Sequence, residues 1–301
     1  SLIIITYFLL KITLPLFSKF LIDKPNSRSS HKIPTPNGGG LIIVFLGITY
    51  FLIQGYYFAI LTIPLAIVSL IDDLKKVDYK TRLLFQGFTV ASIYSGSNLY
   101  ISSSDNEFLS RVLISILLVF LGTGFINFIN FMDGLDGLLS ASMTIIIGII
   151  CLKTNLTILP FIGILIGFLL LNWSPAKIFM GDIGSTFLAA ICLGLIFDTT
   201  EFKTAITKLL IFTPILGDAS ITVLLRLIKK QKLFNPHRMH LFQRLNKAGW
   251  SHSQVSLSYM AATLLLALVY YFFDINLLIA TSFLILLIGI YFDRFVATPI
   301  K

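Results

Sequence analysis

The sequence predicts an all-α, polytopic integral membrane protein with about eleven transmembrane helices. Two observations support this prediction. Hydrophobic residues make up 56% of the 301 residues and charged residues only 12%, and the mean hydropathy is +0.91. A soluble domain of this length would need a far more polar surface. The apolar runs are long enough to span a bilayer, and they are too numerous to be targeting peptides.

The spans follow one another closely, so we expect one transmembrane domain over residues 1–301 and no separate soluble domain. Pro64 and Pro214 lie inside two spans, which is tolerable where neighbouring helices satisfy the freed backbone groups. The expected ranges are 2–22, 40–54, 56–71, 82–97, 109–127, 137–152, 156–172, 184–198, 205–228, 254–273 and 276–293.

Basic residues divide unequally between alternate connections, with sixteen Lys and Arg on one side and four on the other. The positive-inside rule places the richer side in the cytoplasm. The N-terminus is then periplasmic and the C-terminus cytoplasmic, which requires an odd number of spans. The net charge of +9 is typical of such basic loops, so we expect no nucleic acid as a partner. Cys151 and Cys192 lie in predicted spans and are interpreted as packing residues.

Acidic side chains interrupt the apolar sequence at three places on the predicted cytoplasmic side. The first is Asp72-Asp73, which ends the third span and is followed by Lys75, Lys76 and Lys80. Ionisable groups at such places are costly unless they are paired or functional. Taken alone, this motif is typical of a solvated helix end with surface ion pairs.

The second motif runs from Asn127 to Gly137 and contains Asn130, Asp133 and Asp136. The two asparagines are spaced i, i+3, and so are the two aspartates, which makes each pair helical neighbours. Their oxygens suit Mg²⁺ and hydrogen bonds to a ribose or a base. Turn residues leaving a membrane would explain one Asn and one Gly, so four such side chains within ten residues indicate a functional site.

The third motif pairs Asn172, at the end of the seventh span, with Asp182 before the eighth. Gly181, Gly184 and Ser185 surround Asp182. This arrangement is similar to a helix N-terminus whose free N–H groups bind phosphate. Taken alone, Asp182 is more typical of a plain N-cap.

Polar residues in three further places remain open to two interpretations. Asp218, inside the ninth span, is either paired structurally or lines a cavity, and we favour the cavity. His237-Arg238-Met239-His240 and the nearby Arg244 suit phosphate capture, or they form a basic juxtamembrane loop. The glycine-rich loop over 27–40 is a flexible connection or a lip for a nucleotide diphosphate.

Taken in order, these residues resemble the polyprenyl-phosphate N-acetylhexosamine-1-phosphate transferase superfamily. The resemblance runs from Ser29 to about Leu245. It comprises the Ser-Ser-His…Pro-Thr-Pro-Asn-Gly-Gly-Gly loop, Asp72-Asp73, the Asn-Phe-Met-Asp-Gly-Leu-Asp-Gly block, Phe-Met-Gly-Asp182-Ile-Gly-Ser and His-Arg-Met-His. Any one motif could arise by chance, whereas the ordered set is specific.

The resemblance implies an enzyme of the bacterial inner membrane with its active site on the cytoplasmic face. It implies transfer of an N-acetylated sugar 1-phosphate from a UDP-sugar to undecaprenyl phosphate, with release of UMP. Mg²⁺ is the implied cofactor, with Mn²⁺ as a substitute. The implied partners are these two substrates and membrane lipid, and a homodimer is left open. Phosphoryl transfer fits the motifs, because it needs positioning and charge neutralisation more than covalent chemistry.

The resemblance also implies residue roles. Asp182 is the implied metal ligand, with Asp72 and Asp73 beside it. Either of these two aspartates deprotonates the lipid phosphate, or acts as a nucleophile in an older two-step scheme, and Asp133 and Lys80 complete the catalytic set. The resemblance implies a uridine pocket made by Asn172, Asp136 and Phe179, which stacks on uracil. The chemistry of the motifs adds Asn127, Asn130, His237, Arg238 and His240 as candidate substrate-binding side chains.

One departure separates two branches of the superfamily. The muramoyl-pentapeptide branch has consecutive histidines in the last loop, where this sequence has His237-Arg238-Met239-His240. The difference favours the WecA/WbpL-type branch, which starts O-antigen, lipopolysaccharide and capsule-type polysaccharides. The peptidoglycan translocase is the near alternative. An ion-coupled transporter is the distant one, and the sequence has no internal repeat to support it.

Overall fold

The computed structural model describes residues 1–25, 29–31, 33–103, 107–231 and 237–299. Within these ranges the chain is almost entirely helical, apart from one short strand pair. Parts of the predicted polar loops, including Ser27, Arg28, Lys32, Asn235 and Pro236, lie outside the described residues.

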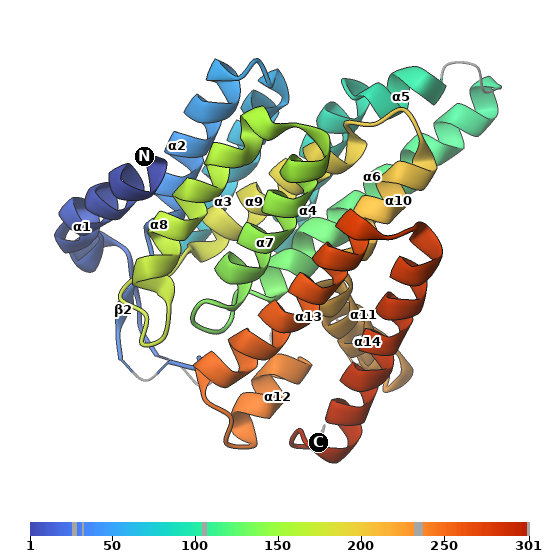
Figure 1. The fold of residues 1–301 in the computed structure, drawn as a ribbon. Coiled ribbons are helices and arrows are strands. Elements are labelled where there is room, and N and C mark those ends of the chain that lie inside the picture. Colours follow the sequence, from blue (N-terminus) through green and yellow to red (C-terminus); the bar gives the residue numbers. More distant parts are fainter. Residues whose placement is uncertain (26–28, 32, 104–106, 232–236, 300–301) are drawn as a thin grey trace.

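The helices form one bundle, with the strand pair, α12 and the C-terminal end in the lower part of Figure 1. The strands pair antiparallel, with Ile22 opposite Pro36. The elements are α1 (Leu2–Phe20), β1 (Ile22–Asp23), β2 (Thr35–Pro36), α2 (Gly39–Ile53), the 3₁₀ helix η1 (Tyr57–Thr62), α3 (Ile63–Leu74), α4 (Tyr79–Ser95), α5 (Asn98–Ser102), α6 (Phe108–Phe131), α7 (Leu138–Thr154), the 3₁₀ helix η3 (Leu156–Phe161), α8 (Ile162–Asn172), α9 (Gly181–Phe197), α10 (Phe202–Leu210), α11 (Thr213–Ile228), α12 (Leu241–Lys247), α13 (His252–Phe272) and α14 (Ile275–Phe295).

Five helical stretches in the described residues are long and apolar enough to cross a membrane, namely α1, η1 with α3, α6, α13 and α14. The bent pair α10–α11 makes a sixth if its halves count as one span. The shorter apolar helices are α2, α7, η3 with α8, and α9. Each of the eleven predicted ranges coincides with a helix or a helix pair. By the length and composition of the described helices, however, only five or six of them are long and apolar enough to cross a membrane.

Prolines mark helix starts in two predicted spans. The span expected over 205–228 is not one helix, because α10 and α11 meet at 83°. Pro214 lies in the first turn of α11, and Pro64 lies in the first turn of α3 after η1. Proline has no N–H, and the first N–H groups of a helix lack intrahelical partners, so proline costs little at these two positions.

Helix α9 lies at the centre of the bundle (Figure 1), and every residue from Ile183 to Phe197 is buried. It packs against α2, α3, α4, α6 and α7. The N–H of Gly40 donates to the carbonyl of Met180 at 2.9 Å, and a Cβ on Gly40 would overlap the backbone of Gly184. Glycine at position 40 therefore allows close helix packing. Ser29, Ser30, His31 and Asn37 of the same loop line a polar cavity, so for them the role of a nucleotide-diphosphate lip stays a prediction.

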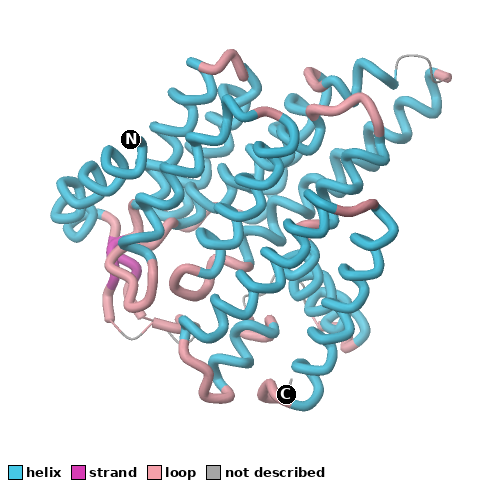
Figure 2. Tube along the Cα trace, viewed as in Figure 1, coloured by secondary structure: helices cyan, strands magenta, loops and turns pink. Residues whose placement is uncertain are grey.

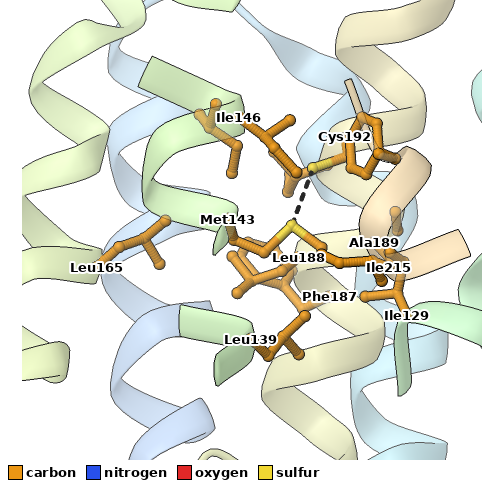
Figure 3. Packing of buried hydrophobic residues seen from close by; sticks show 14 of the residues in the cluster. Ile129, Leu139, Met143, Ile146, Leu165, Phe187, Leu188, Ala189, Cys192 and Ile215 are labelled. Carbon is orange, nitrogen blue, oxygen red and sulfur yellow. Dashed lines mark hydrogen bonds between the residues drawn. The ribbon is translucent and has the colours of Figure 1, made fainter. Parts of the chain in front are cut away.

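The two cysteines are packing residues, as predicted. Both are buried free thiols. Figure 3 shows Cys192 beside Met143, with 3.8 Å between the two sulfur atoms, among aliphatic side chains such as Ile146 and Leu188. This apolar core holds α7 against α9 and so fixes the position of the polar start of α9.

Candidate active site

A polar cavity of about 240 Å³ lies at the start of α9. Segments far apart in the sequence line it, and the loops of this region gather beside the strand pair at the lower left of Figure 2. Five of the predicted site residues line this cavity, namely Asp133, Asp136, Asn172, Phe179 and Asp182. The structure thus brings the second and third acidic motifs together.

Asp73 caps the N-terminus of α9. Its two carboxylate oxygens accept hydrogen bonds from the backbone N–H groups of Asp182 at 3.0 Å and Ile183 at 3.1 Å. A third bond comes from the side-chain amide of Asn37 at 3.2 Å. The expectation that free N–H groups at this helix start bind phosphate is therefore wrong for these two groups, because Asp73 already occupies them. The plain N-cap role considered for Asp182 belongs to Asp73.

Arg82 joins the first and third acidic motifs. One terminal nitrogen of its guanidinium lies 2.6 Å from Asp72 Oδ2, and the other lies 3.0 Å from Asp182 Oδ2. The second oxygen of Asp72 accepts the N–H of Val77 at 2.7 Å. Asp72 therefore faces Asp182 across a guanidinium, and both of its oxygens are engaged by protein donors.

Asn130 and Asn127 lie on the same helix but have different surroundings. Asn130 meets Ser185 Oγ at 2.5 Å. With its amide nitrogen toward α9 it donates to Asp182 Oδ1 at 3.2 Å, and its oxygen accepts from Arg82 at 3.1 Å. Asn127 exchanges hydrogen bonds of 2.6 and 3.3 Å with the buried Gln86 on α4. Asn130 thus belongs to the site, whereas Asn127 joins two helices.

Asp133 and Asp136 lie in the loop between α6 and α7, so they are not helical neighbours as expected. Helix α6 ends at Phe131 because the glycines at 134 and 137 and the polar side chains favour a turn. Burial, followed by the negative charges of Asp182 and Asp73, raises the pKa of Asp133 to about 7. Asp133 therefore exchanges a proton near neutral pH.

Asp136 has its own partners on the opposite wall. Its Oδ2 lies 3.1 Å from His252 Nδ1 and accepts the N–H of Ala176 at 3.2 Å. Burial alone would raise the pKa of Asp136, but the hydrogen bond and the charge of His252 outweigh it, so the pKa lies below its ordinary value. Asp136 is therefore ionised at neutral pH and ties the start of α13 to the cavity.

Asn172 is an internal tie of the cavity wall. Its oxygen accepts from Gly137 N at 3.1 Å and Ser140 Oγ at 2.8 Å, and its nitrogen donates to the carbonyl of Ile178 at 2.9 Å. The half-buried Phe179 follows, with its ring edge-on to His31 at 4.9 Å between centroids. Asn172 thus fixes the loop that presents the Phe179 ring to the cavity.

The histidine-rich loop is mostly committed to structure. Asp218 accepts the N–H groups of Leu241 at 2.7 Å and Phe242 at 3.1 Å and the hydroxyl of Tyr259 at 2.6 Å. His240 is buried, with Nδ1 3.6 Å from Asp218. Asp218 is therefore the structurally paired acid of the two interpretations, although one edge of it also reaches an apolar groove.

His237 and Arg238 precede that buried anchor. Burial, and then the neighbouring positive charges of His240 and Arg226, lower the pKa of His237 to about 4. His237 is therefore neutral at pH 7 and does not supply a cation for phosphate. Arg238 reaches the other polar loop, where its guanidinium donates to Ser30 Oγ at 3.3 Å.

Lys80 lies apart from this arrangement. It is exposed in the first turn of α4, and it is not among the described residues that line the cavity. The basic residue that does contact the acids is Arg82, two positions later. The role of Lys80 in phosphate binding stays a prediction.

Sequence reasoning missed three contributors: Arg82, Gln243 and His252. Gln243 is 9% exposed, and among the described residues no donor meets its buried Oε1. Only Arg82 gave a usable signal, since an arginine as the first residue of a predicted span is costly without a partner. Gln243 lies in the seven-residue helix α12 and His252 is the first residue of α13, and polar residues are ordinary at both kinds of position.

The carboxylates fit a divalent cation of a particular kind. In the described part of the chain, no three His, Cys, Asp or Glu side chains form a closed metal cluster. Mg²⁺, however, is usually held by one or two carboxylates together with waters and substrate phosphates. Asp182 faces the cavity, and the pKa of Asp133 is raised first by burial and then by the negative charges of Asp182 and Asp73, which a cation would offset. The residues therefore suit an open Mg²⁺ site completed by a phosphorylated substrate.

Comparison with known proteins also points to the chemistry of phosphorylated substrates. The profile described as glycosyl transferase family 4 matches residues 41–200. An undecaprenyl-phosphate alpha-N-acetylglucosaminyl 1-phosphate transferase of Salmonella typhi is 30% identical over 278 residues, 82% of this chain and 75% of the relative. The protein of that name from Escherichia coli O157:H7 is 28% identical with the same coverage, and that from Yersinia pestis is 27% identical over 83% of this chain and 76% of the relative.

Proposed function

The chain belongs to glycosyl transferase family 4, and from that premise we propose that it moves an N-acetylated sugar 1-phosphate from a UDP-sugar to undecaprenyl phosphate. The products are UMP and a lipid-linked sugar diphosphate. The relatives named above carry N-acetylglucosamine in their names, so UDP-N-acetylglucosamine is the first donor to test. The product would start a surface polysaccharide of the O-antigen or capsule type.

The observation that carries this proposal is the polar cavity at the start of α9. An aromatic ring at Phe179 and a cluster of carboxylates share one small space. A nucleoside diphosphate sugar needs a flat apolar contact for its base and a site that balances phosphate charge. Asp136, ionised beside His252, offers an acceptor for the N–H or hydroxyl groups of the nucleoside.

In this proposal each aspartate has one task. Asp182 is the residue that would hold Mg²⁺, and the bound ion would neutralise phosphate charge. Asp133 accepts the proton of the acceptor phosphate, because its pKa near 7 suits a base that works at neutral pH. Asp73 holds the start of α9 in place, and the Phe179 ring stacks on the base.

We further propose that all eleven predicted spans cross the inner membrane of a bacterium, with the cavity on the cytoplasmic side. The basic residues are concentrated on the connections of that side. The cavity lies at the polar ends of α3 and α6, where an isoprenoid chain can remain in the bilayer while its phosphate reaches the acids. This orientation lets a cytoplasmic nucleotide and a membrane lipid meet.

The direct test is transfer by the purified protein. A panel of radiolabelled UDP-sugars is offered with undecaprenyl phosphate and Mg²⁺, and labelled lipid and UMP are measured. We expect label in the lipid phase from UDP-N-acetylhexosamines, equal amounts of UMP, and loss of both on chelation with EDTA. Mn²⁺ should restore them.

Two results would contradict the proposal. Turnover of UDP-N-acetylmuramoyl-pentapeptide alone would assign the chain to peptidoglycan synthesis. Release of no UMP from any donor would remove the transferase activity altogether. Transfer that persists in excess EDTA would leave the reaction but exclude the metal.

A further inference from the structure

Arg82 occupies the space between two site acids. It comes from the first turn of α4 and reaches Asp72 on α3 at 2.6 Å and Asp182 on α9 at 3.0 Å, one terminal nitrogen to each. Charge-assisted bonds of this length are strong, and the planar guanidinium fixes the angle between them. The three helices are thus joined at the point where the candidate metal ligand stands.

The partners of Asp72 limit what it can do directly. Oδ1 accepts the Val77 N–H at 2.7 Å and Oδ2 accepts Arg82. Its side chain is only 10% exposed, against 32% for Asp182. Asp72 is also not among the described cavity-lining residues, whereas Asp182 is. Asp72 therefore reaches Asp182 in two ways, through the guanidinium of Arg82 and by the direct approach of the two carboxylates.

Asp73 holds the same residue from the other side. It accepts the backbone N–H of Asp182, as described above, while Arg82 holds the carboxylate of Asp182. The aspartate pair thus fixes both the main chain and the side chain of one residue. Two carboxylates placed close together repel each other, so without the guanidinium the side chain of Asp182 would turn away from Asp72.

We propose that Arg82 is a positioning residue that aims the Asp182 carboxylate at its cation, and that Asp72 acts through Arg82 and touches neither cation nor substrate. The inference rests on the proposed function, because it takes Asp182 as the ligand of a divalent cation. Outer partners of metal ligands hold them in the binding orientation. Lysine in place of Arg82 would keep the charge but lose the two-pronged geometry.

The test measures metal binding without turnover. Mn²⁺ affinity is determined by electron paramagnetic resonance on detergent-purified protein for the wild type, R82Q, R82K, D72N, the double variant D72N/R82Q and K76Q. We expect R82Q and D72N each to weaken Mn²⁺ binding about 10- to 100-fold. The double variant should bind no worse than R82Q. R82K should fall between R82Q and the wild type, and K76Q, which removes an exposed charge from the same face, should bind as the wild type does.

Each result that differs from these expectations overturns a specific part of the inference. Unchanged or tighter binding by R82Q would mean that Arg82 only competes with the cation. A double variant clearly weaker than R82Q would mean that Asp72 acts directly. Absence of Mn²⁺ binding by the wild type would end the inference. If R82Q does not fold, binding by R82K equal to the wild type would overturn the geometric claim. Failure of the proposed function itself appears separately, as a wild type that transfers no sugar phosphate.

Discussion

The same side chain type takes four roles in this site, and the donors around each copy decide which. Asp73 accepts two backbone N–H groups and caps a helix. Asp72 is closed off by Val77 and Arg82. Asp133 is half-buried, and loss of solvation together with the nearby acids raises its pKa to about 7. Asp182 keeps an edge toward the cavity. The role of each aspartate therefore depends on the hydrogen-bond donors and charges around it, because the side chain itself is the same in all four.

Replacement of the candidate metal ligand is the sharpest test at this scale. Asp182→Asn keeps the shape but removes the charge, and we expect transfer to fall by at least about 100-fold, because loss of an outer partner alone already costs 10- to 100-fold. Asp198→Asn is the matched control at the other, exposed end of α9, where the Asp198 carboxylate accepts a hydrogen bond from the Asn98 amide at 2.6 Å. Wild-type rates from purified Asp182→Asn would remove this residue from the mechanism.

Asp133 predicts a pH dependence of stability. Its folded pKa of about 7 exceeds its ordinary value of 3.8, so between these values the folded state binds more protons than the unfolded state. The free energy of unfolding therefore falls as pH rises from about 4 to 7. In EDTA, thermal unfolding should occur at a lower temperature at pH 8 than at pH 6.

Asp133→Asn is the variant that isolates this group. It should reduce the difference between the two pH values without abolishing it, because the raised pKa of Asp73 contributes with the same sign. At pH 8 it should unfold at a higher temperature than the wild type, since the amide carries no charge that must be kept from solvent. An unaltered difference in the variant would assign the titration to another group.

At the scale of elements, α9 is held at both ends by side chains from elsewhere. Asp73 caps its N-terminus, and at the other end the buried Lys208 donates to the carbonyls of Leu195 at 2.6 Å and Asp198 at 3.1 Å. Negative charge at a helix N-terminus and positive charge at a helix C-terminus both interact favourably with the helix dipole and stabilise the helix. These contacts at both ends keep the buried, apolar α9 from sliding along its own axis. They therefore fix the position of Asp182 relative to the neighbouring helices.

Gly181 tests this arrangement. It begins α9 with φ of +74°, and a Cβ there would lie 2.7 Å from Asp73 Oδ2 and 2.8 Å from Asn37 Oδ1. Gly181→Ala should destabilise the protein by about 1–3 kcal/mol through backbone strain and should displace the cap. We expect lower thermal stability and a transfer rate reduced more than tenfold, on the order of one lost charge-assisted bond. Gly249→Ala is the control, because Gly249 has φ of +104° and open space around an added Cβ. It introduces the same kind of backbone strain without a clash near the cap, and it should keep the transfer rate.

At the scale of the whole molecule, the cavity exists only because distant segments meet. Asp73 and Asp182 are 109 residues apart in the sequence, and Ser256 donates to the carbonyl of Asp136 across 120 residues at 2.8 Å. The β1–β2 loop, the α6–α7 loop, the α8–α9 loop and the α12–α13 region each add a wall. The cavity therefore forms only where these four regions meet.

Cysteine labelling tests the proposed orientation. Ala248→Cys and Ser95→Cys place thiols at exposed positions on the predicted cytoplasmic and outer sides, while Cys151 and Cys192 are buried. A membrane-impermeant maleimide added to spheroplasts should label position 95 and should reach position 248 only after the membrane is opened. The reverse pattern would invert the topology and place the cavity outside.

The sequence alone determined the helical membrane class, the family and the polar segments that form the cavity. Hydrophobic run length and the cost of charge near a bilayer are properties of local composition, so they can be read without coordinates. Composition also flagged Pro64 and Pro214, although not that α10 and α11 meet at an angle. The cysteines were assigned correctly for the same local reason.

Only the tertiary structure decided which acid does what. The cap formed by Asp73, the guanidinium between Asp72 and Asp182, the pairing of Asn127 with Gln86 and the entry of His252 and Gln243 all depend on partners from other helices. A hydrogen bond acts over about 3 Å, and the packing of apolar faces, which is not directional, sets which polar groups come within that distance. The sequence names the polar groups, and the fold assigns their partners.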